Sequence, residues 1–280
     1  MGRQELGEMT GPRPAALIPH AVLAQWLAPA RRPGAVGYTA VYYKEQSRPA
    51  DLAAQLAEMI AHAKCNLESL RRLLQRVGWL KASARLAPSK RPAGRHGDFG
   101  EVLAIGLLEE FGNIHVPVVK LRIQMDPEQS LHGSDVVGFH LALDSSGKLL
   151  VEDLEFLEVK CRTTRDKQQA AKAHKQLVDD RAAQFADTIE FLQLRLEELG
   201  NPELLEAFET YLAARDTDPE GRYRISLVFD EDEWRDDELD ELPDPPDLCA
   251  PLTVEVVLVN HLQTLIDETW DAVPAVALSE

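Results

Sequence analysis

Short segments rich in β-branched and aromatic residues are separated by long amphipathic segments in this chain, and that order restricts the fold most strongly. Strands are expected at residues 116–125, 135–143, 155–161, 223–229 and 253–259. Helical spacing of apolar residues covers 164–199, where one break is expected, and continues after Gly200 to about residue 214. Three strands, a long helix and further strands predict an α/β domain with a central mixed sheet flanked by helices.

The regions on either side of this pattern are less regular. The sequence predicts an irregular arm at 1–34, a strand at 36–43, one long helix at 51–79, a linker or flexible loop at 84–97 and a short last helix at 262–270. Asp98 is expected to cap a helix that runs to Phe111. Residues 1–95 are therefore assigned to an N-terminal region packed on or leading into the core, and residues 96–280 to the core domain.

Length and cysteine usage exclude several classes of protein. A chain of 280 residues suits one large α/β domain. It has no apolar run of about 18 residues, as a membrane span requires, and no signal-peptide pattern. The three cysteines, at positions 65, 161 and 249, are isolated, which argues against disulfides and against a zinc site. We therefore expect a cytoplasmic protein that does not associate with a membrane.

The net charge of −17 is unfavourable for a protein that binds nucleic acid, but the charge is unevenly distributed. Residues 1–100 contain 15 Lys and Arg against 7 Asp and Glu, and segment 69–97 has eight basic residues and no acid. Segment 160–175 has six basic residues and one acid. Segment 69–97 is either a path for DNA or a surface for a partner, and segment 160–175 is either a DNA-facing helix start or a solvated helix face. Net charge therefore does not exclude nucleic acid.

The acidic run 230–247 contains 11 Asp and Glu and a single Arg235, and it ends in a proline-rich stretch. A solvated loop is the ordinary interpretation of such a run. The alternative is that it faces a basic partner, or occupies a DNA channel until a partner moves it.

The expected strand from Phe156 to Cys161 carries the most informative chemistry. Side chains alternate along a strand, so Leu157, Val159 and Cys161 point to one face and the intervening Glu158 and Lys160 to the other. Asp135 opens the preceding strand of the hairpin, which places its carboxylate near Glu158. On its own, such an acid–lysine pair is more often a solvent-facing pair on an edge strand, with little energetic effect.

Two carboxylates beside a lysine suit hydrolysis of a phosphodiester. The reaction needs a hard divalent cation and a positive group near the nucleophile or the leaving oxygen. Asp135, Glu158 and the carbonyl of Val159 would bind Mg²⁺, with Mn²⁺ as a substitute, and Lys160 would stabilise the nucleophile or the transition state. Glu101, on the preceding helix, would be a third carboxylate that binds or orients the metal, although an acid in a first helical turn is also favoured by the helix dipole alone.

Asp135, followed 23 residues later by Glu158-Val-Lys160, resembles the signature of the PD-(D/E)XK nucleases, with Ser134 where that family nominally has proline. The larger pattern of Lys120-Leu-Arg122, Leu131-His-Gly-Ser-Asp135 and Glu158-Val-Lys160 resembles the nuclease subunit of the Hachiman anti-phage defence system over about residues 95–260. The resemblance implies a restriction-endonuclease-like core, Mg²⁺-dependent cleavage of DNA and a superfamily-2 helicase partner.

Five further residues are candidates for contact with nucleic acid: His132, Lys120, Arg122, Arg162 and Lys167. Each is also compatible with a structural role or a solvated surface. Two functional alternatives remain open at this stage. One is a catalytically inactive, nuclease-like subunit used for assembly or DNA recognition. The other is a restriction-type endonuclease that acts without a partner.

Overall fold

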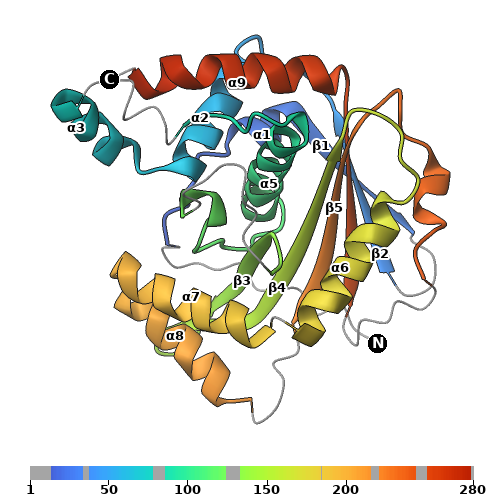
Figure 1. Ribbon diagram of the computed structural model, residues 1–280. Coiled ribbons are helices and arrows are strands. Elements are labelled where there is room, and N and C mark those ends of the chain that lie inside the picture. Colours follow the sequence, from blue (N-terminus) through green and yellow to red (C-terminus); the bar gives the residue numbers. More distant parts are fainter. Residues whose placement is uncertain are drawn as a thin grey trace.

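The computed structural model describes residues 14–33, 38–77, 86–123, 133–183, 185–215, 221–243 and 251–278. Its centre is a six-stranded mixed sheet with the strand order β1-β2-β6-β5-β4-β3 (Figure 1). The strands are β1 (Leu27–Pro33), β2 (Tyr38–Glu45), β3 (Val136–Leu143), β4 (Leu149–Arg162), β5 (Arg222–Asp230) and β6 (Leu252–Val259). The inner pairs are parallel, and the two outer pairs, β1–β2 and β3–β4, are antiparallel.

Helices cover both faces of this sheet (Figure 1). The core on one face includes α1 (Val22–Trp26), α2 (Leu52–Lys64), α5 (Pro92–Glu110) and α9 (Leu262–Leu278), and α3 (Leu67–Val77) joins it by packing against α9. The other face packs on α6 (Gln169–Ala183), α7 (Phe185–Leu199) and α8 (Pro202–Ala213). Each face has its own hydrophobic core, as expected for a largely parallel sheet. None of the described helices has the length and apolarity needed to cross a bilayer.

Alternation along β4 explains how one strand serves both cores. Leu157, Val159 and Cys161 belong to the core on the α5 side, as the sequence predicted, while Phe156 belongs to the core on the α6 side. Glu158 points to the α6 side and is only 1% exposed. The interpretation of Glu158 and Lys160 as a solvent-facing pair is therefore wrong.

Other sequence predictions are confirmed with changed boundaries. The hairpin turn at 144–147 is present: Asp144 Oδ1 accepts hydrogen bonds from the amides of Ser146 and Lys148, and Gly147 has a φ of +83°. The break in the long helical segment lies between α6 and α7. The last helix extends to Leu278, beyond the predicted end at residue 270.

The predicted strand at 116–125 is wrong for its described part. His115 and Phe139 exchange two backbone hydrogen bonds of 3.0 and 2.7 Å, but this bridge to β3 is isolated. Pro117 has no N–H group, so the segment cannot continue a ladder. The chain instead forms the 3₁₀ helix η2 (Lys120–Arg122).

Three predictions for the N-terminal third are also wrong. The helix expected at 51–79 is two helices, because Asn66 caps α3 through a 2.9 Å bond from the amide of Ser69 to its Oδ1. The linker expected at 84–97 contains the start of α5, with Pro92 in the first turn. Asp98 is therefore not an N-cap but a buried helical residue, 2.7 Å from Lys64 Nζ.

The expected irregular arm at 1–34 contains α1 and the edge strand β1 in its described part. Residues 231–243, hereafter the acidic segment, are not a solvated loop as expected. They include the 3₁₀ helix η3 (Asp236–Leu239) and bury Trp234, Leu239 and Leu242 against the sheet.

Candidate active site

The candidate site lies where β4 extends beyond the start of its neighbour. Because Val136 pairs with Leu157, residues 158–162 of β4 have β5 on one side and no β3 partner on the other. Asp135 directly precedes β3, and its Oδ2 accepts a 2.8 Å hydrogen bond from the amide of Val159. The N–H and C=O groups of one residue in a strand point to the same side, so the carbonyl of Val159 also faces this free edge.

Glu158 and Lys160 are adjacent on the α6 face of this strand segment. Lys160 Nζ donates to Glu158 Oε1 at 2.5 Å and to Gln176 Oε1, on α6, at 3.1 Å. The second oxygen of Glu158, Oε2, is buried and accepts no hydrogen bond from a described donor, and the Glu158 carboxyl lies within hydrogen-bond reach of the Asp135 carboxyl. Two buried carboxyl groups held against each other are costly, and such pairs concentrate at functional sites.

Three carboxyl groups from different elements converge here. Burial and then the neighbouring Asp135 charge raise the pKa of Glu158 to about 8, although Lys160 opposes the shift. Burial also raises the pKa of Asp135, against the hydrogen bond from Val159. The pKa of Glu101, on α5, is raised well above its usual range by burial and then by the charge of Asp135. The site therefore favours the entry of positive charge.

Lys120, on η2, is a second lysine beside these carboxylates. Burial lowers the pKa of its ammonium group, and the charges of Asp135 and Glu101 are the main opposing influences. The structure thus brings Lys120 into the cluster that contains Lys160, although the strand expected to carry it does not exist.

Gln176 and Asp180 were missed by the sequence interpretation. They are four residues apart on α6 and therefore share one face of that helix. Burial raises the pKa of Asp180, with Lys120 opposing the shift and Asp135 adding to it, and its buried Oδ2 has no hydrogen-bond partner among the described residues. The polar i, i+4 pair on the first helix after the Glu-Val-Lys strand was the available signal.

The donor set is compatible with a hard divalent cation. Among the described residues, no three His, Cys, Asp or Glu side chains are grouped closely enough to form a metal site by themselves. Mg²⁺, however, is usually bound through one or two carboxylates and keeps several waters. Asp135, Glu158 and the carbonyl of Val159 supply that smaller set, and such an ion would replace the hydrogen bond between the two carboxyl groups.

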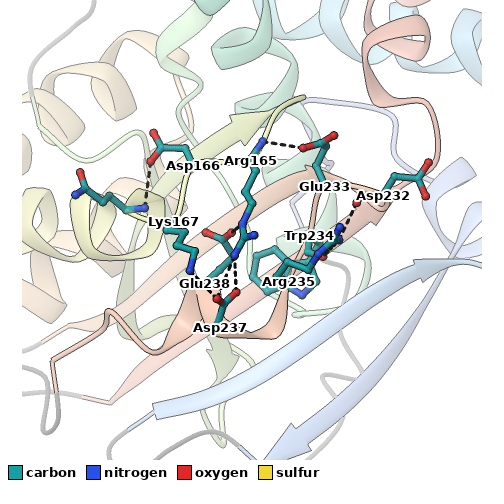
Figure 2. Close-up of polar contacts among 10 residues, drawn as sticks. Arg165, Asp166, Lys167, Asp232, Glu233, Trp234, Arg235, Asp237 and Glu238 are labelled. Atoms are coloured by element: carbon teal, nitrogen blue, oxygen red, sulfur yellow. Dashed lines mark hydrogen bonds and ion pairs between the residues drawn. The ribbon is translucent and has the colours of Figure 1, made fainter.

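The remaining nucleic-acid candidates lie in other surroundings. Arg122 donates to the carbonyls of His62 (2.5 Å) and Leu17 (3.4 Å). Arg162 donates to the carbonyl of Cys161 at 2.9 Å. Lys167 pairs with Asp237 of the acidic segment at 2.8 Å (Figure 2). His132 lies outside the described residues.

Comparison with known families decides the identity of the chain. A model of the HamA family matches residues 21–279, which is nearly the whole sequence. The chain belongs to the HamA family. HamA proteins act in the Hachiman anti-phage defence system, which works with partners, so the predicted relationship to this system is confirmed. No curated protein matches the chain.

Proposed function

We propose that this HamA protein is a Mg²⁺-dependent nuclease of the PD-(D/E)XK type that hydrolyses DNA phosphodiester bonds. The observation that carries the proposal is the buried pair of facing carboxyl groups, Glu158 and Asp135, with the Lys160 ammonium beside them at the free edge of β4. Unpartnered oxygens also occur in other buried carboxyl groups, such as Glu238 and Glu255, so they do not identify the site by themselves. Two buried carboxyl groups held against each other are costly for structure alone and favour a cation that both can bind.

Each residue has a defined task in this proposal. Asp135, Glu158 and the Val159 carbonyl would hold Mg²⁺, which when bound neutralises the charge that develops on the phosphate. Gln176 fixes the Lys160 ammonium, so that its positive charge remains beside the reacting phosphate. Glu101, whose pKa is raised beside Asp135, would ionise when the cation enters and so bind or orient it.

The acidic composition favours a partner that delivers the DNA. A net charge of −17 disfavours independent binding to a polyanion. We propose a superfamily-2 helicase as that partner, which agrees with the role of HamA proteins in a system that works with partners. Dependence on delivery would also restrain the nuclease in an uninfected cell.

The test is cleavage of linear and circular duplex DNA in Mg²⁺ and in EDTA, with and without a helicase encoded by a neighbouring gene. We expect Mg²⁺-dependent cleavage by the wild type and its loss in Glu158→Ala/Lys160→Ala. The matched control is Glu206→Ala/Lys148→Ala, which removes an exposed acid–lysine pair of 2.8 Å elsewhere on the surface. It should cleave as the wild type does.

Two other results would replace the proposal. If no condition gives cleavage and the Glu158→Ala/Lys160→Ala variant still protects cells against phage, the chain is a non-catalytic assembly or DNA-recognition subunit. If the chain cuts a short duplex as a homodimer without a partner, it is a stand-alone, restriction-type endonuclease.

A further inference from the structure

The loop at residues 163–168, hereafter the basic loop, leads from the candidate site into α6. It begins directly after β4, which carries Glu158 and Lys160, and ends where α6 begins. Arg165 and Lys167 of this loop both point to the acidic segment (Figure 2). A basic loop that joins two elements of the site is well placed for the backbone of a polyanionic substrate.

The carboxylate of Asp237 forms ion pairs with both Arg165 and Lys167. Arg165 Nη2 donates to its two oxygens at 3.0 and 3.1 Å, and Lys167 Nζ donates to Oδ2 at 2.8 Å. The hydrogen bond from Lys167 is the main cause that lowers the pKa of Asp237. A phosphate group is bound in the same way as this carboxylate, by an arginine and a lysine that donate hydrogen bonds to its oxygens.

The contacts of Asp237 differ from those that anchor the acidic segment. Trp234, Leu239 and Leu242 are buried, and Glu238, 2% exposed, accepts a 3.2 Å hydrogen bond from Arg165 Nε. The Asp237 side chain is 43% exposed. The buried contacts hold the segment and orient Arg165, whereas the exposed carboxylate contributes little to stability and is open to exchange.

We propose that Arg165 and Lys167 form a phosphate-binding site for the DNA backbone, and that Asp237 occupies it until DNA displaces the carboxylate. The identity of the ligand as DNA rests on the proposed function. Glu238 remains in place during the exchange and keeps Arg165 oriented. The acidic segment is thereby an internal competitor that weakens DNA binding by the isolated chain.

Binding of the full-length protein to a fluorescent duplex, measured by anisotropy in EDTA at several salt concentrations, tests this exchange. Asp237→Asn should tighten binding about threefold to tenfold at low salt and steepen the slope of log Kd against log salt by roughly one to two, because two cations become available to phosphate. The matched control is Asp240→Asn. It removes the same charge from an exposed residue of the same segment.

The double variant Asp237→Asn/Lys167→Ala identifies the site. We expect it to lose most of the DNA affinity gained by Asp237→Asn. Lys167→Ala is preferred to Arg165→Ala because Arg165 also forms a hydrogen bond with buried Glu238. Thermal unfolding monitors the fold of each variant. Equal gains in Asp237→Asn and Asp240→Asn, a gain that persists without Lys167, or no binding by any variant at low salt would each overturn the proposal. Binding is measured in EDTA, which prevents metal-dependent cleavage, so this test is independent of nuclease activity. If Asp237→Asn alone binds DNA more tightly and the wild type cleaves no DNA in Mg²⁺, the phosphate site is retained and the nuclease function is rejected.

Discussion

Glu155 and Glu158 lie three residues apart on β4, point to opposite faces of the sheet and are almost completely buried, yet their electrostatic surroundings are opposite. Burial alone would raise the pKa of Glu155, but the hydrogen bond from His140 Nε2, 2.7 Å from Oε2, and the charge of Arg224 lower it to about 2. Burial beside Asp135 raises the pKa of Glu158 to about 8.

The difference teaches how a buried carboxylate can be assigned to structure or to function. Glu155 belongs to a network that continues through Arg224 to Glu255, which also accepts a 3.5 Å bond from Tyr43 Oη. Both oxygens of Glu155 have partners inside the protein. Glu158 instead faces a second carboxyl group, that of Asp135, and its Oε2 accepts no bond from a described donor. A buried carboxylate with donors on both oxygens stabilises the fold, whereas two carboxyl groups held together are suited to a cation.

Glu158→Gln should produce the largest functional effect. The substitution keeps the size of the side chain but removes a metal-binding carboxylate, so DNA cleavage should fall about a thousandfold, equivalent to several kcal/mol of transition-state stabilisation. Its free energy of unfolding should change by less than about 1 kcal/mol, because a carboxyl with a pKa of about 8 is mainly neutral at pH 7. Cleavage rates and urea unfolding at pH 7 measure the two effects separately. A loss of several kcal/mol in the free energy of unfolding, enough to explain the lost cleavage, would contradict the functional assignment.

Glu155→Gln should give the reverse result. It leaves Arg224, whose side chain is 11% exposed, without one of its two carboxylate partners, and removal of one partner from a buried ion pair costs roughly 3 kcal/mol. The urea midpoint should fall, while the folded protein should cleave DNA at a rate close to that of the wild type. A thousandfold loss of cleavage in the folded variant would mean that the two glutamates belong to one functional unit.

The contrast between these glutamates also shows how far the sequence could lead. Alternation along residues 156–161 correctly placed Leu157 and Cys161 on one face and Glu158 on the other, because period two is a local property of any strand. The approach of Asp135 to Glu158 was predicted in the same way, since a hairpin brings its two strands together in a known register.

Contacts across the parallel part of the sheet could not be predicted locally. Arg224 meets Glu155 and Glu255 only because β5 lies between β4 and β6, and no property of the three segments alone specifies that order. The same limit hid Asp180, which approaches Lys120 and Asp135 through the packing of α6 on β4. The edge strand β1 was missed because its prolines and arginines resemble an irregular arm, and its pairing with β2 decides its structure.

Asp180→Asn tests whether Asp180, a partly exposed residue with one buried carboxylate oxygen, belongs with Glu158 or with Glu155. If Asp180 orders Lys120 within the site, cleavage should fall about tenfold, as expected for loss of one electrostatic positioning contact of about 1.4 kcal/mol, and stability should hold. Asp179→Asn is the neighbouring control, since Asp179 pairs with exposed Lys175 on the outer side of α6. Equal cleavage by the two variants, together with lower stability of Asp180→Asn, would place Asp180 with Glu155 among the structural residues.

Acid stability gives the smallest expected effect and sharpens the assignment of Glu155. A carboxyl with a pKa of about 2 in the folded state and 4.5 in the unfolded state stabilises the protein fully above pH 4.5, and the contribution decreases as the pH falls toward 2. Between pH 5.5 and 3.5 the wild type should therefore lose roughly 1 kcal/mol that Glu155→Gln, already less stable, does not lose. Urea unfolding of both proteins across this range gives the slope of the free energy of unfolding against pH for each. The other carboxyl groups contribute equally to both slopes, so the difference between the slopes reports on Glu155. Equal slopes would show that Glu155 is not held ionised by His140 and Arg224, and would contradict the assignment of Glu155 as a structural residue.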